Sequence, residues 1–203
     1  MANRGRFGKY GEKKRIERLR RAKVEPCYAQ RRQIISEKIQ ADYRKTAQKA
    51  GHITLRYAKA SDVDFIRTLS GNAFHEYGPY EEILPRWFLS GLTVTLLALM
   101  KKKPVGFAML GRHQHVWYAP RVSEMLAIAV APGSRRLGIA DRLMREIEKR
   151  AKELQVKTLV LHTAIENVAG QQLFKKRGFT PSMNKKGFYP GGQDALMMAK
   201  ELA

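Results

Sequence analysis

The chain has 203 residues, which suits one domain with an appendage. Hydrophobic residues make up 44% of it, so a folded core is expected and wholesale disorder is excluded. The longest apolar run, Leu92–Met100, is far shorter than the roughly 20 residues that cross a bilayer. The first residues contain no apolar signal-peptide core, and Cys27 is the single cysteine. We therefore expect a cytoplasmic protein without disulfides, a Cys-based zinc site or a transmembrane segment.

The net charge is the first unusual feature. Lys and Arg total 39 against 18 Asp and Glu, which gives +21. Residues 1–51 contain 16 of the basic side chains and only 5 of the acidic ones. A quarter of the chain thus carries half of the excess charge, and we divide the chain into a basic arm (1–51) and an α/β domain (52–203).

The basic arm is predicted to be helical after a disordered start. Residues 1–11 are rich in Gly and Arg without periodicity, whereas Glu12–Lys23 and Ala29–Ala50 favour helix. Two interpretations stay open. The arm is either an electrostatic tether to nucleic acid, the ribosome or an acidic membrane, or a pair of charged helices that packs on the domain through its few apolar residues.

After Gly51 the pattern becomes an alternation of strands and helices. Period-two alternation and apolar runs indicate strands, whereas apolar residues spaced three and four apart indicate helices. The predicted strands are His52–Tyr57, Thr93–Leu99, Pro104–Leu110, Glu124–Val130, Thr158–His162, Phe188-Tyr189 and Asp194–Met198. The predicted helices are Val63–Phe74 (capped by Ser61-Asp62), Glu81–Leu89, Ile139–Leu154 and Val168–Arg177. Lys101–Lys103 joins the second and third strands as a hairpin.

A short basic turn between a predicted strand and a long helix has the composition of an anion site. It follows Pro132 and contains Arg135, Arg136, Gly138 and Ala140. The first amides of a helix have no internal partners, and the helix dipole attracts anions there. Gly138 lets the backbone approach a phosphate closely, and the arginines add positive charge. The turn is predicted to hold a pyrophosphate, the alternative being an ordinary connection with surface arginines.

This turn and its surroundings resemble the GNAT superfamily of acetyl-CoA-dependent N-acetyltransferases. The resemblance rests on Leu126–Pro132, Arg135-x-x-Gly138-x-Ala140, Leu159–Asn167 and Leu173–Phe179, in that order. It covers roughly residues 52–200. It implies a central mixed, mostly antiparallel sheet flanked by helices, an N-acetyltransferase activity, and acetyl-CoA as cosubstrate.

The resemblance also implies which residues bind the cosubstrate. The backbone of Ile128, Ala129 and Val130 would pair with the pantetheine arm as an added strand does. Asn167 would contact the same arm, with a helix N-cap as its alternative role, and Phe174 would pack beside it. The pyrophosphate would be held by the amides of Arg135, Arg136, Leu137, Gly138, Ile139, Ala140 and Asp141.

Acetyl transfer to an amine needs a base, because an alkylamine is mostly protonated near pH 7. Two candidates are Glu124, where relatives often carry an acidic residue, and His162. The Leu161-His162 segment resembles a eukaryotic protein N-terminal acetyltransferase in which that histidine is catalytic. Each has a structural alternative: a strand-end charge facing water for Glu124, and a hydrogen-bonded strand-end histidine for His162.

Many relatives have a general-acid tyrosine where this chain has Phe174. Phenylalanine has no proton to give to the leaving thiolate. Tyr189 is the candidate substitute, and its alternative role is a tyrosine packed in a strand. No metal site is predicted, because His113 and His115 have no third ligand near them in the sequence.

Two segments bear on the acceptor. Phe188–Met198 resembles the ending of ribosomal-protein alanine N-acetyltransferases and of their protein N-terminal relatives, which implies a peptide α-amine. His75–Glu82 lies where the family places acceptor-side residues, and its acids and aromatics suit a cationic amine. Two other hypotheses stay open: a small-molecule amine acetyltransferase, and a nucleic-acid-binding protein that senses acetyl-CoA with little turnover.

Overall fold

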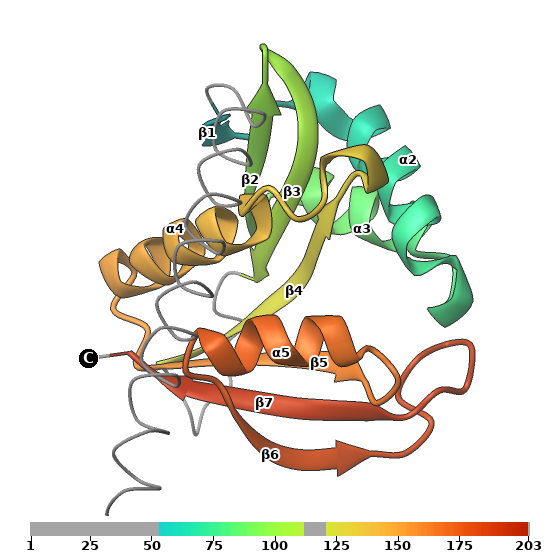
Figure 1. Cartoon of the computed structure of the whole chain (residues 1–203), viewed down its shortest axis with the longest axis vertical. Helices are drawn as coiled ribbons and strands as arrows, with labels where there is room; N and C mark the ends of the chain where they lie inside the picture. Colours follow the sequence, from blue (N-terminus) through green and yellow to red (C-terminus); the bar gives the residue numbers. More distant parts are fainter. Residues whose placement is uncertain (1–52, 112–120, 203) are drawn as a thin grey trace, which may run out of the picture. The chain divides into compact units, whose positions relative to one another are not determined.

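The computed structural model describes residues 53–111 and 121–202. Within these ranges the chain forms a seven-stranded sheet with helices on both faces (Figure 1). The predicted α/β fold is therefore confirmed. The predicted basic arm and the pair His113 and His115 lie outside the described residues, so the division of the chain into an arm and a domain stays a prediction.

The sheet runs in the order β1-β2-β3-β4-β5-β7-β6. Neighbouring strands are antiparallel except for β4 and β5, which pair in parallel. This is the mixed, mostly antiparallel sheet that the resemblance implies. The strands are β1 Ile53–Tyr57, β2 Thr93–Met100, β3 Lys103–Gly111, β4 Val122–Val130, β5 Thr158–Ala164, β6 Thr180–Lys185 and β7 Ala195–Glu201.

The β2–β3 hairpin is the most buried part of the sheet, since both strands are apolar on both faces. Met100 pairs with Lys103, so the turn contains only Lys101 and Lys102 and is one residue shorter than predicted. Their φ angles are 50° and 65°, the left-handed conformation that two-residue hairpin turns favour.

Helices cover the two faces of the sheet and bury two hydrophobic clusters. Leu96 belongs to one cluster and Leu97 to the other, as expected when successive strand residues point to opposite faces. Helices α4 (Ile139–Glu153) and α5 (Val168–Lys176) pack on the Leu96 side. Helices α2 (Val63–Phe74) and α3 (Tyr80–Leu89) pack on the Leu97 side. The predicted helices thus form within a residue or two of their expected ends.

The start of α2 is stabilised in a different way from the predicted cap. Asp62 precedes the helix, but its carboxylate makes no capping bond to the first turn. It accepts hydrogen bonds from both guanidinium ends of Arg56 at 2.7 and 2.8 Å and from the Lys59 amide at 2.7 Å. The Arg56 bonds hold the pKa of Asp62 below its usual range. The ion pair ties β1 to the helix start.

The C-terminal strands correct the sequence prediction. Phe188 and Tyr189 lie in a loop, not in a strand, and the partner of β7 is β6, which was not predicted. Strand β6 is almost entirely exposed and contains Pro181, so it lacks the apolar alternation that identifies a strand in sequence. Edge strands tolerate proline because one side of their backbone has no partner.

A buried carboxylate connects three elements on the α4 side. Glu148 of α4 accepts hydrogen bonds from Arg177, which ends α5, at 2.7 and 3.1 Å and from Lys200 of β7 at 2.8 Å. Burial by itself raises the pKa of Glu148, but the bonds from Arg177 and Lys200 outweigh it and lower the pKa below its usual value. The carboxylate therefore stabilises the fold when it is charged.

Replacing this carboxylate is expected to destabilise the fold in a pH-dependent way. Glu148→Gln should lower the free energy of unfolding at pH 7 by about 2 kcal/mol, because two partly buried cations lose their counter-charge. A folded-state pKa below the unfolded one gives stability above the unfolded pKa, and that stability is lost as the pH falls through the folded pKa. Urea titrations of wild type and variant at pH 7 and pH 3 measure this. An equal difference at both pH values would contradict the assignment.

No helix in the described ranges is long and apolar enough to cross a bilayer.

Candidate active site

A split between β4 and β5 creates the central cleft. The two strands pair only from Val122–Met125 with Thr158–Leu161, whereas β7 pairs with the whole of β5, Thr158–Ala164, along its other edge. Within the described residues, the edge of β4 beyond Met125 that faces β5 therefore has no neighbouring strand. Figure 1 shows the two strands spreading apart in this region. A free strand edge presents backbone amides and carbonyls to a ligand.

A bulge shapes β4 where the split begins. Met125 pairs with Leu110 and Ala127 with Met109, which leaves Leu126 as the extra residue. Leu126 and Ala127 both pack with the α2–α3 cluster, whereas Met125 belongs to the α4 cluster. A bulge re-aims the residues on either side of it, and here it separates the free edge at Ile128–Val130 from the paired part that carries Glu124.

The turn before α4 forms the larger of two adjoining cavities, of about 630 Å³. Gly138 has a φ of 74° and precedes the helix, whose first turn closes with the Arg142 amide donating to the Gly138 carbonyl at 3.0 Å. The amides of Ile139, Ala140 and Asp141 therefore lie at the open helix start. An added Cβ on Gly138 would meet no atom within 4 Å, so the space next to it is free.

Of the residues predicted to bind the cosubstrate on β4 and in this turn, all but one line the larger cavity. Ile128, Ala129, Val130, Arg135, Arg136, Gly138, Ile139, Ala140 and Asp141 all line it. Leu137 does not, because its side chain packs against the α4-side core. Its amide stays a predicted ligand that no contact tests.

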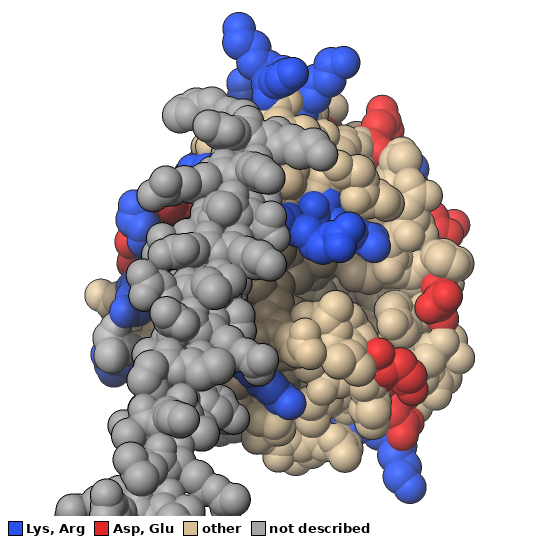
Figure 2. Space-filling view, in the orientation of Figure 1, with Lys and Arg blue, Asp and Glu red and all other residues tan. Residues whose placement is uncertain are grey.

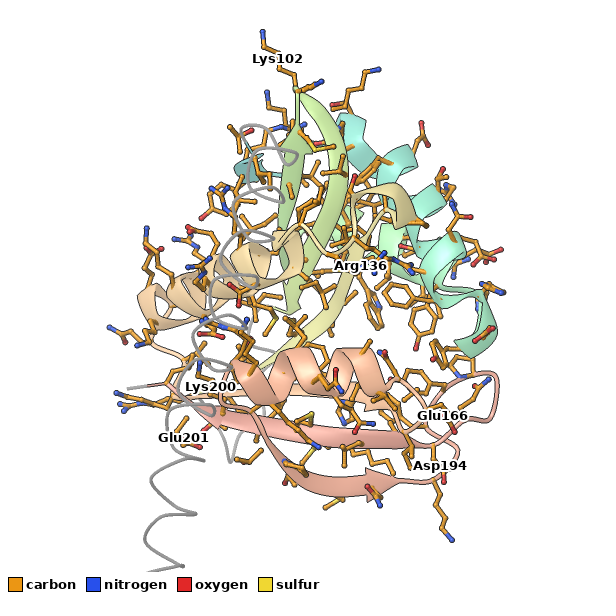
Figure 3. The ribbon with its side chains drawn as sticks, in the orientation of Figure 1. Lys102, Arg136, Glu166, Asp194, Lys200 and Glu201 are labelled. Atoms are coloured by element: carbon orange, nitrogen blue, oxygen red, sulfur yellow. The ribbon has the colours of Figure 1, made fainter. Side chains whose placement is uncertain are left out.

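Positive charge dominates the walls of the larger cavity. Arg135, Arg136 and Lys176 line it, and Figure 3 shows Arg136 above the gap between the two halves of the sheet. The carboxylate of Asp141 also lines it but is balanced by Arg145 at 3.1 Å and by Arg177 at 3.8 Å. The helix start and these cations together suit a diphosphate.

Asn167 and Phe174 lie where the two cavities meet, since both line each of them. Asn167 caps α5, because its side-chain oxygen accepts from the Gly170 amide at 3.0 Å. Its amide nitrogen donates to the Thr163 hydroxyl at 3.2 Å. The N-cap role is therefore present, and the cavity position leaves the predicted ligand role open as well.

The smaller cavity, of about 210 Å³, is lined by aromatic side chains. Tyr189 is one of them: its ring lies 5.0 Å from the ring of Tyr77 and 6.4 Å from that of Tyr80, measured between centroids. Burial, followed by the nearby phenols and carboxylates, raises the pKa of Tyr189 well above its usual value. The hydroxyl therefore stays protonated at neutral pH. Further aromatic lining residues are Phe74, Trp87, Phe174 and Phe188.

Glu124 and His162 form a direct pair in the smaller cavity. His162 Nδ1 lies 2.6 Å from Glu124 Oε1, and both residues line the cavity. Only 8% of the His162 side chain is exposed, against 38% for Glu124. The His162 ring stacks on Phe188 at 4.2 Å, and its Nε2 is buried with no hydrogen-bond partner among the described residues. The sequence offered these two residues as separate candidates, and the fold brings them together.

The loop between β6 and β7 closes one side of the aromatic cavity by docking on η2 (His75–Tyr77). The Gly191 amide donates to the Tyr77 carbonyl at 3.0 Å, and the Gln193 side chain donates to the Glu76 carbonyl. Gly78 has a φ of 140°, and a Cβ there would come within 2.8 Å of Pro190. This contact fixes Phe188 and Tyr189 in the cavity wall.

The sequence named only part of the aromatic wall. Tyr77 and Tyr80 fall in the acceptor-side segment that was predicted, but Phe74 and Trp87 were not singled out. Their positions on amphipathic helices gave the same signal as ordinary core residues. Only the packing of α2 and α3 against β4 turns them toward the cavity.

Known proteins share this architecture. The sequence matches the acetyltransferase (GNAT) family over residues 63–179, more than half of the chain. An N-alpha-acetyltransferase of Saccharolobus solfataricus is 27% identical over 161 residues, which cover 76% of this chain and 96% of the relative.

Two solved structures show the same fold. Ribosomal-protein-alanine N-acetyltransferase from Brucella melitensis has a TM-score of 0.63 and 23% identity, over 73% of this chain and 99% of that one. The structure of yncA from Salmonella typhimurium, solved with its cofactor acetyl-CoA, has a TM-score of 0.64 and 17% identity, over 74% and 94%. Taken with the split sheet, the glycine-led helix start and the family match, this means that the chain belongs to the acetyltransferase (GNAT) family.

Proposed function

We propose that the chain transfers the acetyl group of acetyl-CoA to the α-amine of a protein or peptide, by direct attack of the amine on the thioester in a ternary complex. As a GNAT N-acetyltransferase the chain uses acetyl-CoA. The peptide amine is the finer part of the proposal. The observation that supports a peptide acceptor is the Glu124–His162 pair, which lies in an aromatic cavity that adjoins the cofactor cleft. The N-alpha-acetyltransferase relative supports the same acceptor.

The residues of the larger cavity fit acetyl-CoA. The free edge at Ile128–Val130 supplies backbone groups for a pantetheine arm, and the amides after Gly138 supply donors for a diphosphate. The free space beside Gly138 leaves room for the phosphates at the backbone. When bound, acetyl-CoA supplies the activated acetyl group, and the strand amides near Ile128 are placed to polarise its carbonyl.

The proposed base is His162, with Glu124 as its partner. Near pH 7 only about one α-amine in ten is unprotonated, so a proton must be removed before attack. When Nδ1–H of His162 donates to Glu124, the tautomer leaves a lone pair on Nε2. That nitrogen is buried and unpartnered in the described structure, so it is free to take the amine proton. The carboxylate then stabilises the charged imidazole.

Two tyrosines are candidates to protonate the leaving thiolate in place of the absent hydroxyl at Phe174. Tyr189 lines the aromatic cavity, and Tyr77 lines both cavities. Burial raises the pKa of both phenols, so each keeps its proton at neutral pH. Removing the hydroxyl that acts as the acid should lower kcat about 10- to 100-fold with little change in the KM for acetyl-CoA.

The measurement compares Tyr189→Phe and Tyr77→Phe, each of which keeps the ring. Tyr57→Phe is a matched control, because Tyr57 is exposed on β1 and lines neither cavity. Wild-type kcat in both cavity variants would mean that the thiolate leaves without a tyrosine proton.

An acceptor panel tests the proposed function. Peptides with a free N-terminus, the same peptides blocked at the N-terminus but containing lysine, and small diamines are each incubated with acetyl-CoA, and CoA release is followed. We expect rapid release only with free N-termini. Faster release with diamines would favour a small-molecule acceptor, and binding of acetyl-CoA without release for any amine would favour a sensor.

A further inference from the structure

The helices on the two faces of the sheet differ in charge. Residues 60–90, which include α2 and α3, contain five Asp and Glu against two Lys and Arg. Residues 135–157, which include α4, contain eight Lys and Arg against four Asp and Glu. Figure 2 shows acidic side chains along the right-hand margin, whereas basic ones lie over the hollow and, among a few acidic ones, at the left. Helix α4 is therefore on the more basic side of the sheet.

The exposed face of α4 carries a stripe of basic side chains. They follow one another at intervals of three, four and three residues, which places them on one side of a helix. The opposite side packs on the sheet through Leu143, Ile147 and Ala151. At a rise of 1.5 Å per residue the stripe is about 15 Å long. Its exposed members are Arg142, Arg145, Lys149 and Lys152.

The ion pairs of α4 balance only part of this charge. Arg145 pairs with an aspartate of the first turn at 3.1 Å, and Lys149 lies 3.9 Å from a glutamate. Arg142 and Lys152 form no ion pair within the described ranges. The stripe therefore presents net positive charge to the solvent.

The stripe ends at a basic hollow of about 360 Å³ beyond the end of α4. Arg121, Lys152 and Lys157 line it, and its described lining residues include no Asp or Glu. The backbone holds two of these cations side by side, because the amides of Lys157 and Thr158 both donate to the Arg121 carbonyl, at 2.7 and 3.1 Å. The carboxylate of Glu201 accepts from the Thr158 hydroxyl instead of lining the hollow. Cations gathered around one hollow repel one another, and a bound anion relieves that repulsion.

The stripe and the hollow are separate from the active site. Strand β5 begins at Thr158 beside the hollow, and His162 lies four residues further along it, about 13 Å away at the usual rise of a strand. None of the basic residues of the stripe or the hollow lines either cavity of the cleft. We call this surface the basic face, and it consists of Arg121, Arg142, Arg145, Lys149, Lys152 and Lys157.

We propose that the basic face binds the sugar–phosphate backbone of a nucleic acid. A linear stripe of cations is complementary to a strand of regularly spaced phosphates, and the hollow at its end can hold one phosphate between three cations. Such contacts fix position without reading the base sequence, so we expect DNA and RNA of any sequence to bind. An acidic membrane fits less well, because the apolar side of α4 is buried against the sheet and cannot enter lipid. The inference does not depend on which amine is acetylated.

The test measures how strongly binding by the full chain depends on salt. Fluorescence anisotropy gives the Kd for a labelled DNA duplex of about 20 base pairs, and for an RNA duplex of the same sequence, from about 50 to 200 mM salt. Each phosphate contact contributes about 0.9 to the slope of log K against log salt on DNA. Arg121→Gln, Lys152→Gln and Lys157→Gln combined should reduce that slope by about 2.7 and raise the Kd at low salt at least about tenfold. Arg142→Gln combined with Lys149→Gln should reduce the slope by about 1.8.

A matched control removes three positive charges from another surface. Lys101→Gln, Lys102→Gln and Lys103→Gln combined change the tip of the β2–β3 hairpin, and they should leave the slope close to that of wild type. All three variants should bind acetyl-CoA with wild-type affinity, which shows that they are folded.

Three results would overturn the proposal. An unchanged slope in the hollow variant would mean that other parts of the chain make the phosphate contacts. An equal loss in the hairpin control would mean that total charge governs binding rather than the basic face. If the hollow variant loses binding to vesicles of phosphatidylserine and phosphatidylcholine but keeps binding to nucleic acid, the basic face is a membrane surface.

Discussion

Gly138→Glu is expected to abolish binding of acetyl-CoA. The substitution places a carboxylate at the open start of α4, where the amides and Arg135 favour an anion. Like charge against a diphosphate at close range costs several kcal/mol, so the Kd should rise by at least about 100-fold. Isothermal calorimetry measures it directly.

Two matched variants separate charge from backbone strain. Gly138→Ala places a Cβ at the same left-handed φ of 74° without charge, and it should cost about 1 kcal/mol of stability and only a small part of the affinity. Gly133→Glu adds the same carboxylate to the same turn at a residue that does not line the cavity and has free space around it. Its Kd should stay within a few-fold of wild type. A folded Gly138→Glu protein with wild-type affinity for acetyl-CoA would mean that the pyrophosphate binds elsewhere.

His162→Ala is expected to lower kcat by about 100- to 10,000-fold, the usual range for a lost general base. Glu124→Gln should lower kcat less, by about tenfold, because the new amide still contacts His162 but does not stabilise its charged form. In the double variant the amine must lose its proton unaided. The acidic limb of the pH–rate profile should then move toward the pKa of a free α-amine, about 8.

Free imidazole distinguishes a chemical role of His162 from a packing role. Added to His162→Ala, it should restore part of kcat, because it supplies the missing nitrogen to the space beside Phe188. Glu201→Gln is the control for Glu124→Gln. Glu201 is at the far end of β7 (Figure 3), where it accepts a hydrogen bond from the Thr158 hydroxyl of β5. An unaltered pH profile in the double variant would exclude both residues as the base.

The helical half of the cofactor site was predictable from sequence because its signals are local. A basic glycine turn followed by a long amphipathic run defines the start of α4, and helix α4 begins at Ile139 as predicted. The free edge of β4 was implied by resemblance alone. Its physical cause is that the parallel β4–β5 ladder ends at Met125 and Leu161, which no local pattern records.

The Glu124–His162 pair depends on strand register. Glu124 is opposite Val160, so His162 lies two residues further along β5, where the strands begin to separate. That spacing lets the two side chains meet across the opening. The sequence placed both residues on strands but contained nothing to fix their register, and it therefore offered two bases rather than one pair.

The aromatic cavity was the least predictable part. Its walls come from α2, η2, α3, β4, β5, α5 and the β6–β7 loop, and they meet only through tertiary contacts such as that of Gly191 with Tyr77. The exposed strand β6 gave no sequence signal, so the loop that carries Tyr189 was expected to be a strand. The contribution of the arm at residues 1–51, including contact with nucleic acid or the ribosome, stays a prediction.

The most direct test of the central claim is to locate the transferred acetyl group. The full chain is incubated with acetyl-CoA and a peptide that carries both a free N-terminus and an internal lysine, and the product is sequenced by tandem mass spectrometry. We predict one acetyl group on the N-terminal α-nitrogen, formed in step with CoA release and lost in His162→Ala. Acetyl on the lysine side chain, or no peptide-dependent CoA release, would contradict the account.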